Sequence, residues 1–229
     1  QAALVSCGYK AEVLHNTGRE VIETGLKYVN NDICYPALLV IGQLINALES
    51  GKYDLEHTAL IITQTGGGCR ASNYIYLLRK ALEKAGLTHI PVISLNVNGL
   101  EQQPGFHLDA SMVHKFLAAV VYGDTLMYLT NKTRPYEVVH GAADRLAQKW
   151  LARLSEAFKS GKAQALGTIK QLTKAIAHEF ADLPITNKEK IKVGIVGEIY
   201  IKYAALGNNN LEAFLQRQNC EYMLPGLMN

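Results

Sequence analysis

Two cysteines have sequence surroundings that suit thiolate chemistry. Cys69 follows the run Gly66-Gly67-Gly68 and directly precedes Arg70, within the motif TQTGGGCRASNY. Glycines have no β-carbon, so this loop can turn sharply and its backbone can approach a ligand closely. A helix that begins here would favour an anion and the thiolate form of a cysteine, through its free N–H groups and its dipole. A thiolate is a nucleophile and a soft metal ligand, which suits redox chemistry or iron–sulfur ligation.

Cys34 stands in a second setting of the same kind, within the motif NNDICYPALLVIGQ. Turn-forming Asn and Asp residues come before it and Pro36 follows, which predicts that a helix begins at Cys34. If both loops open toward the same crevice, the two thiols can serve one metal cluster. A [4Fe–4S] cluster ordinarily takes four cysteines. Cys7 and Cys220 lie beside predicted strands and are typical of packing residues, so another chain, an added ligand or residues outside this chain would complete the set.

Three other interpretations of these loops stay open. The glycines can serve only a tight turn, with Cys69 as a small buried residue. The loop can instead hold a phosphate, although the sequence has neither a Gly-Lys-Ser/Thr run after the loop nor a GxGxxG fingerprint. Cys34 and Cys69 can also form a thiol redox switch, which requires their α-carbons to lie within about 7 Å of each other.

Short apolar runs and helical patterns alternate around both motifs. The alternation, with short connections, predicts a right-handed parallel βαβ unit. We therefore predict an α/β fold with a doubly wound, mostly parallel sheet of flavodoxin- or Rossmann-like units and an additional helical segment. Strands are expected at residues 10–14, 58–64, 91–95, 192–196 and 221–224, helices at 19–29, 36–48, 72–85, 108–130, 137–159, 162–180 and 211–218, and a long loop at 197–210.

The domain organisation follows from the same pattern. Residues 1–107 are expected to form an α/β unit with both cysteine motifs, residues 108–185 a helical segment, and residues 186–229 returning α/β elements. Ligands of such sheets gather at the carboxyl ends of the strands. Loops at residues 65–69, 96–99 and 197–210 are all expected at that edge.

Composition excludes several classes of protein. The chain has 229 residues, of which 48% are hydrophobic and 19% charged, as in ordinary globular proteins. The net charge of +3 is too small, and the lysines too dispersed, for a nucleic-acid-binding protein. No stretch approaches the roughly 20 apolar residues that span a bilayer, and the N-terminus lacks a secretory pattern. Without a CxxC pair, the cysteines predict reduced thiols in the cytoplasm, and the start of the chain is typical of a fragment of a larger protein.

These motifs together resemble one region of large proteins related to the activator and cluster-bearing subunits of 2-hydroxyglutaryl-CoA dehydratase. In many anaerobic bacteria such a region follows an actin-like ATPase module in one long polypeptide. The resemblance covers roughly residues 8–227. It rests on the segments GLKYVNNDICYPALLVIGQ, TQTGGGCRASNY, PVISLNVNG and VGIVGEIYIKYAALGNNNLEAFL.

The resemblance implies an iron–sulfur cluster, of the [4Fe–4S] type and prone to loss in air, in an ATP-coupled electron-transfer system of low potential. By this resemblance Cys34 and Cys69 would be cluster ligands. The glycines of the run Gly66-Gly67-Gly68 would let the backbone approach the cluster, and Arg70 would offset its negative charge. The implied partners are an actin-like ATPase module, in the same polypeptide or in a partner chain, an acyl-CoA substrate and a second copy of the chain.

Two departures bear on the activity that the resemblance implies. The third cysteine of a dehydratase-type site has no counterpart here, and no ATPase phosphate motif is present. Lyase activity of the dehydratase type, or a role in an activase system, therefore stays an expectation. The alternative is a non-catalytic module of the same large protein that binds a phosphate or CoA, or docks a partner.

Overall fold

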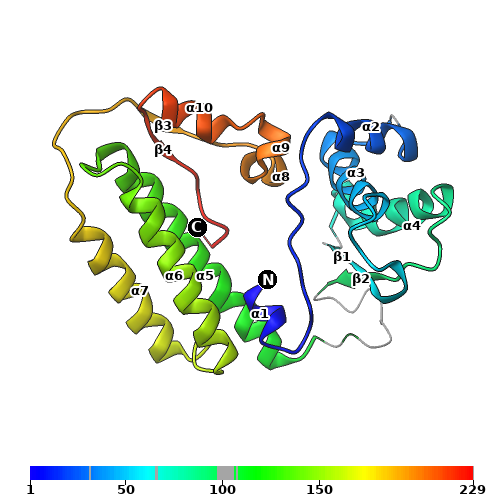
Figure 1. Cartoon of the computed structure of the whole chain (residues 1–229), viewed down its shortest axis with the longest axis horizontal. Coiled ribbons are helices and arrows are strands. Elements are labelled where there is room, and N and C mark those ends of the chain that lie inside the picture. The colour runs from blue at the N-terminus through cyan, green and yellow to red at the C-terminus, as the bar shows by residue number, and fades with distance from the viewer. Residues whose placement is uncertain (31, 65–66, 97–105, 107, 229) are drawn as a thin grey trace. The chain divides into compact units, whose positions relative to one another are not determined.

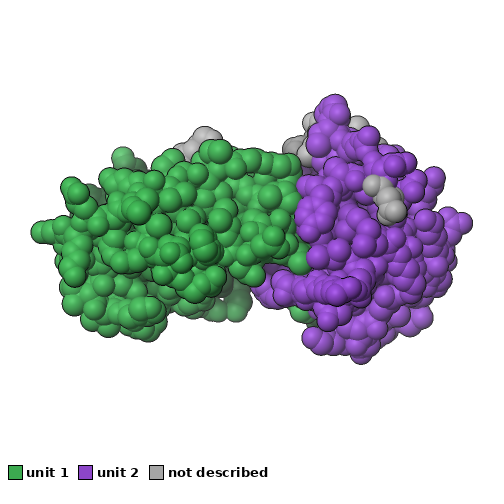
Figure 2. Space-filling model, turned by 90° about the horizontal axis from the view of Figure 1, so that it is seen from above, with its two compact units in different colours: residues 1–12, 109–229 green, residues 13–108 purple. Residues whose placement is uncertain are grey.

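The structure is a computed structural model and describes residues 1–30, 32–64, 67–96, 106 and 108–228. The chain divides into two compact units, which Figure 2 shows in different colours. Unit 1 comprises Gln1–Glu12 and Asp109–Asn229, and unit 2 is the intervening segment Val13–Leu108. Within the described residues, no helix combines the length and the apolar character that crossing a membrane requires.

Unit 2 is built around a parallel βαβ arrangement. β1 (Leu60–Thr63) pairs in parallel with β2 (Val92–Leu95), and α4 (Tyr74–Lys84) connects the two strands. The predicted βαβ unit is therefore confirmed. The other elements of unit 2 are α2 (Arg19–Tyr28), α3 (Tyr35–Glu49) and the short 3-10 helices η1 (Leu55–His57) and η2 (Arg70–Asn73).

One hydrophobic cluster joins these elements. Ile41 and Ile45 of α3 are fully buried, and they pack in one cluster with apolar residues of β1 and α4. The side of α3 that carries them is strongly apolar, as the segment at residues 36–48 predicts. Burial of a side chain of this size contributes about 1.5–3 kcal/mol to stability, so this cluster fixes α3 against the βαβ arrangement.

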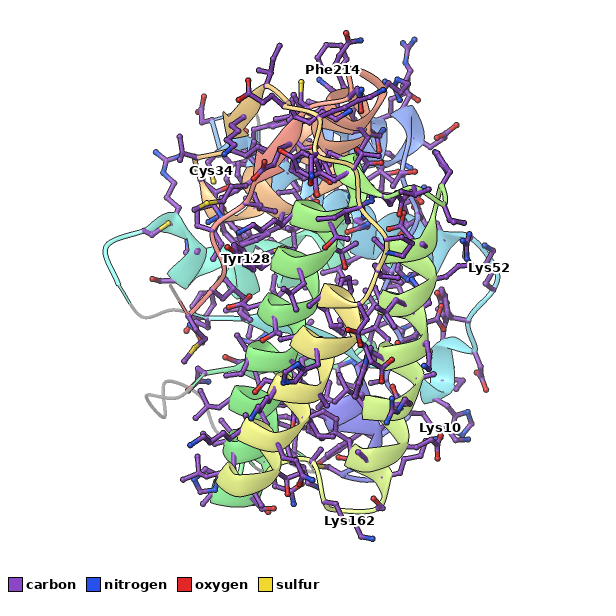
Figure 3. All side chains as sticks on the ribbon, turned by 90° about the vertical axis from the view of Figure 1, so that its left-hand side faces the viewer. Lys10, Cys34, Lys52, Tyr128, Lys162 and Phe214 are labelled. Carbon is purple, nitrogen blue, oxygen red and sulfur yellow. The ribbon has the colours of Figure 1, made fainter. Side chains whose placement is uncertain are left out.

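Unit 1 is mostly helical. Its three long helices, α5 (Ala110–Thr133), α6 (Ala142–Lys159) and α7 (Leu166–Ala181), lie beside one another in Figure 1. Lys162, labelled in Figure 3, lies in the connection between α6 and α7. The remaining elements of unit 1 are α1 (Ala2–Val5), η3 (Arg134–Tyr136), β3 (Lys192–Gly194), α8 (Ile199–Tyr203), α9 (Ala205–Asn208), α10 (Leu211–Arg217) and β4 (Glu221–Met223).

The predicted doubly wound sheet is not found among the described residues. The chain is an α/β protein of mostly helical content, with two separate two-stranded parallel sheets, β1–β2 in unit 2 and β3–β4 in unit 1. The physical reason is that α5, α6 and α7 bury their apolar sides mainly against one another, around Tyr122 and Trp150, while α5 also packs against β4.

Two smaller predictions are also wrong. Residues 10–14 form no strand, because no neighbouring strand pairs with them in the described structure. The expected loop at residues 197–210 folds into α8 and α9. That segment follows β3 in unit 1, so it does not share a sheet edge with the segments after β1 and β2.

Gly42 lies where α3 crosses α2. A β-carbon added to Gly42 would lie 2.9 Å from the backbone nitrogen of Gly25 and still closer to the carbonyl oxygen of Val21. A β-carbon added to Gly25 would lie 2.5 Å from the carbonyl oxygen of Leu38. Because the obstructing atoms belong to the backbone, a larger residue at either glycine must push the two helices apart.

We expect Gly42→Ala to destabilise unit 2 by about 1–3 kcal/mol, because overpacking at a helix crossing forces backbone shifts. Hydrogen exchange of peptides from α2 and α3, read by mass spectrometry, should become faster. Gly123→Ala in α5 is the matched control, since its β-carbon would meet no atom within 4 Å. Unchanged exchange in the Gly42→Ala variant would contradict the tight crossing.

Candidate functional site

Cys34 is the N-cap residue of α3. Its backbone is extended, with φ −66° and ψ 146°, and Pro36 lies in the first turn of the helix. The predicted helix start is therefore confirmed. The Cys34 sulfur is partly buried and lies 2.9 Å from the hydroxyl oxygen of Tyr74, the first residue of α4. This contact holds the thiol beside the N-terminal end of α4.

Cys69 is the N-cap residue of a much shorter element. The four residues after it form the 3-10 helix η2, and α4 begins only at Tyr74. The Cys69 sulfur accepts a weak hydrogen bond from the backbone nitrogen of Ala71 at 3.5 Å, and the residue is exposed to solvent. The helix expected at residues 72–85 forms as α4, but the 3-10 turn η2 separates it from Cys69, and the thiol is accessible.

Arg70 connects the two cysteine segments. Its guanidinium donates a hydrogen bond of 2.6 Å to the carbonyl oxygen of Asp32, two residues before Cys34. The Cys34–Tyr74 contact joins the same two segments a second time. The structure therefore brings the two predicted motifs together, although they lie far apart along the chain. All four cysteines of the protein are free thiols.

A chain of polar side chains behind the glycine loop fixes the position of Cys69. The Ser94 hydroxyl donates to Gln64 Oε1 at 2.7 Å, and Gln64 Nε2 donates to the carbonyl oxygen of Ser72 at 3.0 Å. Gln64 and Ser94 are both buried, at the ends of β1 and β2. Sequence reasoning missed this pair, and its only signal was a polar residue at the end of each apolar run.

The space beside the described glycines of the loop is open. Gly66 lies outside the described residues. Gly67 and Gly68 are exposed, and a β-carbon added to either would meet no atom within 4 Å. The Ser72 hydroxyl donates to the carbonyl oxygen of Gly67 at 2.6 Å and folds the loop onto η2. Packing among the described residues therefore does not require glycine at either position.

The other two cysteines belong to unit 1. The Cys7 sulfur lies 3.4 Å from the ammonium nitrogen of Lys115, and Cys220 is 7% exposed in an apolar cluster with Leu215 and Tyr222. The prediction that Cys220 is a packing residue is confirmed. Across the described ranges, no three or more His, Cys, Asp or Glu side chains come together as a metal site. The candidate site accordingly offers two thiols, Cys34 and Cys69.

Comparison of the chain with known protein families, with curated proteins and with solved structures found no match. The resemblance to proteins of the 2-hydroxyglutaryl-CoA dehydratase system therefore stays a prediction. The chemistry of the site follows from its own residues, which are two thiols, an arginine and a bare glycine loop at one end of unit 2.

We expect the cysteines to differ in their alkylation by iodoacetamide under native, oxygen-free conditions. Cys69 is exposed and should react first, and the buried Cys220 should react last, more slowly by at least about tenfold because it needs local opening of a core. Mass spectrometry of quenched samples gives the order. In denaturant the difference should disappear, and equal native rates would contradict the burial of Cys220.

Proposed function

We propose that unit 2 binds an iron–sulfur cluster through Cys34 and Cys69. In this proposal the chain is a domain of a protein related to 2-hydroxyacyl-CoA dehydratases and their activases, and it takes part in ATP-coupled electron transfer at low potential. The observation that carries the proposal is the hydrogen bond from Arg70 to the carbonyl oxygen of Asp32, which holds the two cysteine segments together. The family relationship rests on the motif resemblance alone.

The two thiols fit half of the ligand set that a [4Fe–4S] cluster takes. Iron–sulfur clusters are held by thiolates, and an exposed residue and a partly buried one supply them here. Cys7 and Cys220 belong to unit 1, so the proposal assigns the remaining positions to donors outside unit 2, such as a second polypeptide. When bound, such a cluster supplies one-electron transfer.

Neighbouring residues suit an electron-rich, anionic group. The Tyr74 hydroxyl lies within hydrogen-bond distance of the Cys34 sulfur, and a hydroxyl that donates to a thiolate stabilises its charge. The Arg70 guanidinium brings a fixed positive charge to the segment before Cys34, where it donates to the carbonyl oxygen of Asp32. Hydrogen bonds to sulfur and local charge are two of the factors that set a cluster's reduction potential.

We expect the purified chain to take up iron and sulfide under anaerobic reconstitution and to gain visible absorption. Cys34→Ala and Cys69→Ala should each lose most of the bound iron and the colour, because each removes one of two thiolate ligands. Cys7→Ala is the matched control and should load as the parent chain does, since Cys7 lies in unit 1. Iron analysis and absorption spectra measure the outcome.

Two results would reject the cluster. One is a parent chain that stays colourless and iron-free after anaerobic reconstitution together with a chain that supplies further thiols. The other is undiminished iron binding in the Cys34→Ala and Cys69→Ala variants.

A second candidate is a non-catalytic module whose glycine loop binds a phosphate or the pantetheine end of CoA. The open space at Gly67 and Gly68 favours it, because a ligand can approach the backbone there. In that case Gly67→Val should weaken CoA binding by about tenfold or more, since the branched side chain blocks close approach. Calorimetric titration with CoA measures this.

The cysteine variants separate the two candidates. If the loop is a CoA site, Cys34→Ala and Cys69→Ala keep the affinity for CoA. A Gly67→Val variant that binds CoA like the parent chain would exclude the module. Because the added side chain has room, the variant should keep the thermal stability of the parent chain.

A further inference from the structure

Unit 1 contains a groove of about 890 Å³ that the cluster proposal does not use. The C-terminal part of α5, the end of α7 and the segment that leads into β3 form its walls. Tyr128, labelled in Figure 3, lies on the α5 side, and Ile185, which is 54% exposed, contributes an apolar surface from the segment after α7. Organic ligands occupy pockets of about 300–1,000 Å³, so the volume suits a molecule larger than a simple ion.

Four lysines line this groove, which are Lys132, Lys188, Lys190 and Lys192. In the described part of the chain, none of them forms an ion pair. Lys190 donates to the amide oxygen of Asn219 at 2.5 Å and Lys132 to the Tyr128 hydroxyl at 3.4 Å, and both of these acceptors are neutral. The ammonium charges are therefore not compensated by direct contacts.

Two carboxylates also line the groove. Glu221 accepts a hydrogen bond of 2.5 Å from the Tyr136 hydroxyl, and this bond raises the pKa of Tyr136 above its ordinary value. Glu189 is exposed and lies within the segment that carries three of the lysines. Four ammonium groups against two carboxylates leave the lining with a net positive charge.

Asn131 adds a buried donor that folding leaves without an acceptor. It is 5% exposed, and its Oδ1 accepts a hydrogen bond of 3.1 Å from the guanidinium of Arg134. A guanidinium can only donate, so this bond fixes which amide atom is oxygen. Asn131 Nδ2 has no partner anywhere in the described structure. A buried donor without an acceptor lowers stability, which favours an acceptor atom supplied from outside.

Asn131 lines a smaller pocket that shares three residues with the groove. This inner pocket has a volume of about 60 Å³ and shares Tyr128, Lys132 and Glu221 with the groove. It has room for a polar group of a few atoms. Asn131 and Lys132 therefore line the same small space.

We propose that the groove binds an organic diphosphate. The lysines bind the phosphate oxygens, the amide of Asn131 donates to an oxygen that enters the inner pocket, and the organic part lies along the exposed side chain of Ile185. Lysine binds phosphate as a compact point charge, and several ammonium groups suit a group with two or three negative charges. The groove is also larger than a diphosphate alone requires.

Calorimetric titration of the full chain at constant ionic strength tests the proposal, with ADP, inorganic pyrophosphate, adenosine and malonate as probes. We expect ADP to bind most tightly, pyrophosphate more weakly, and adenosine and malonate not measurably. Pyrophosphate that binds as tightly as ADP would overturn the organic part of the proposal. No binding of ADP or pyrophosphate at millimolar concentration would overturn the site.

Variants assign the binding to the groove. Lys188→Gln with Lys192→Gln should weaken ADP binding by about tenfold or more, because two charge-assisted hydrogen bonds to phosphate are lost. Lys170→Gln with Lys174→Gln removes the same charge from exposed positions of α7 that do not line the groove and should leave the affinity within about twofold. Equal losses in the two double variants would show a general charge effect and overturn the assignment.

Asn131→Asp tests the inner pocket. The substitution keeps an acceptor for Arg134 but replaces the unpartnered donor with a carboxylate oxygen. We expect at least about a tenfold loss of ADP affinity, because the new charge repels phosphate and the donor is gone. A variant of parental thermal stability and parental ADP affinity would show that Asn131 does not contact the ligand and that water fills the inner pocket.

Discussion

Burial of one side of α3 against the βαβ arrangement is the constraint on which the candidate site depends. Ile41 and Ile45 lose all solvent exposure in this contact, so α3 cannot slide or rotate without exposing them. α2 crosses α3 where Gly25 of α2 meets Gly42 of α3, and this close contact further restricts the position of α3. Cys34, at the N-terminal end of this confined helix, therefore has a defined position beside Tyr74.

Cys69 is positioned by a different kind of interaction. No long helix holds it, and the residue is exposed, so apolar burial contributes little there. The buried hydrogen bonds from Ser94 through Gln64 to the backbone of Ser72 take over this role and tie the start of η2 to the ends of both strands. Buried polar groups are costly when unpaired, which makes such a network sensitive to position. One thiol is thus held by packing and the other by directional bonds.

Local patterns predicted the elements of unit 2, because β1 and α4 are encoded by contiguous residues. Local patterns did not predict that the strands form two separate two-stranded sheets, because the pairing of strands depends on residues distant in sequence. β3 has only three residues, and both of its ends are exposed. The helix start at Cys34 followed from turn residues and proline. The bond of Arg70 to a backbone carbonyl did not, because every residue has such a carbonyl and only the fold selects one.

The lysines of the groove in unit 1 are a second feature that local sequence could not predict. Lys188, Lys190 and Lys192 are spaced at alternate positions in the sequence, and such a run is ordinarily a solvated surface segment. Only the packing of α5 beside α7 turns the surface they face into a groove. Asn131 distinguishes this groove from an ordinary basic surface. Solvated lysines do not reduce the stability of the fold, whereas a buried amide donor without an acceptor does reduce it. Arg134 prevents the amide from turning to relieve that cost, so the acceptor has to come from solvent or from a ligand.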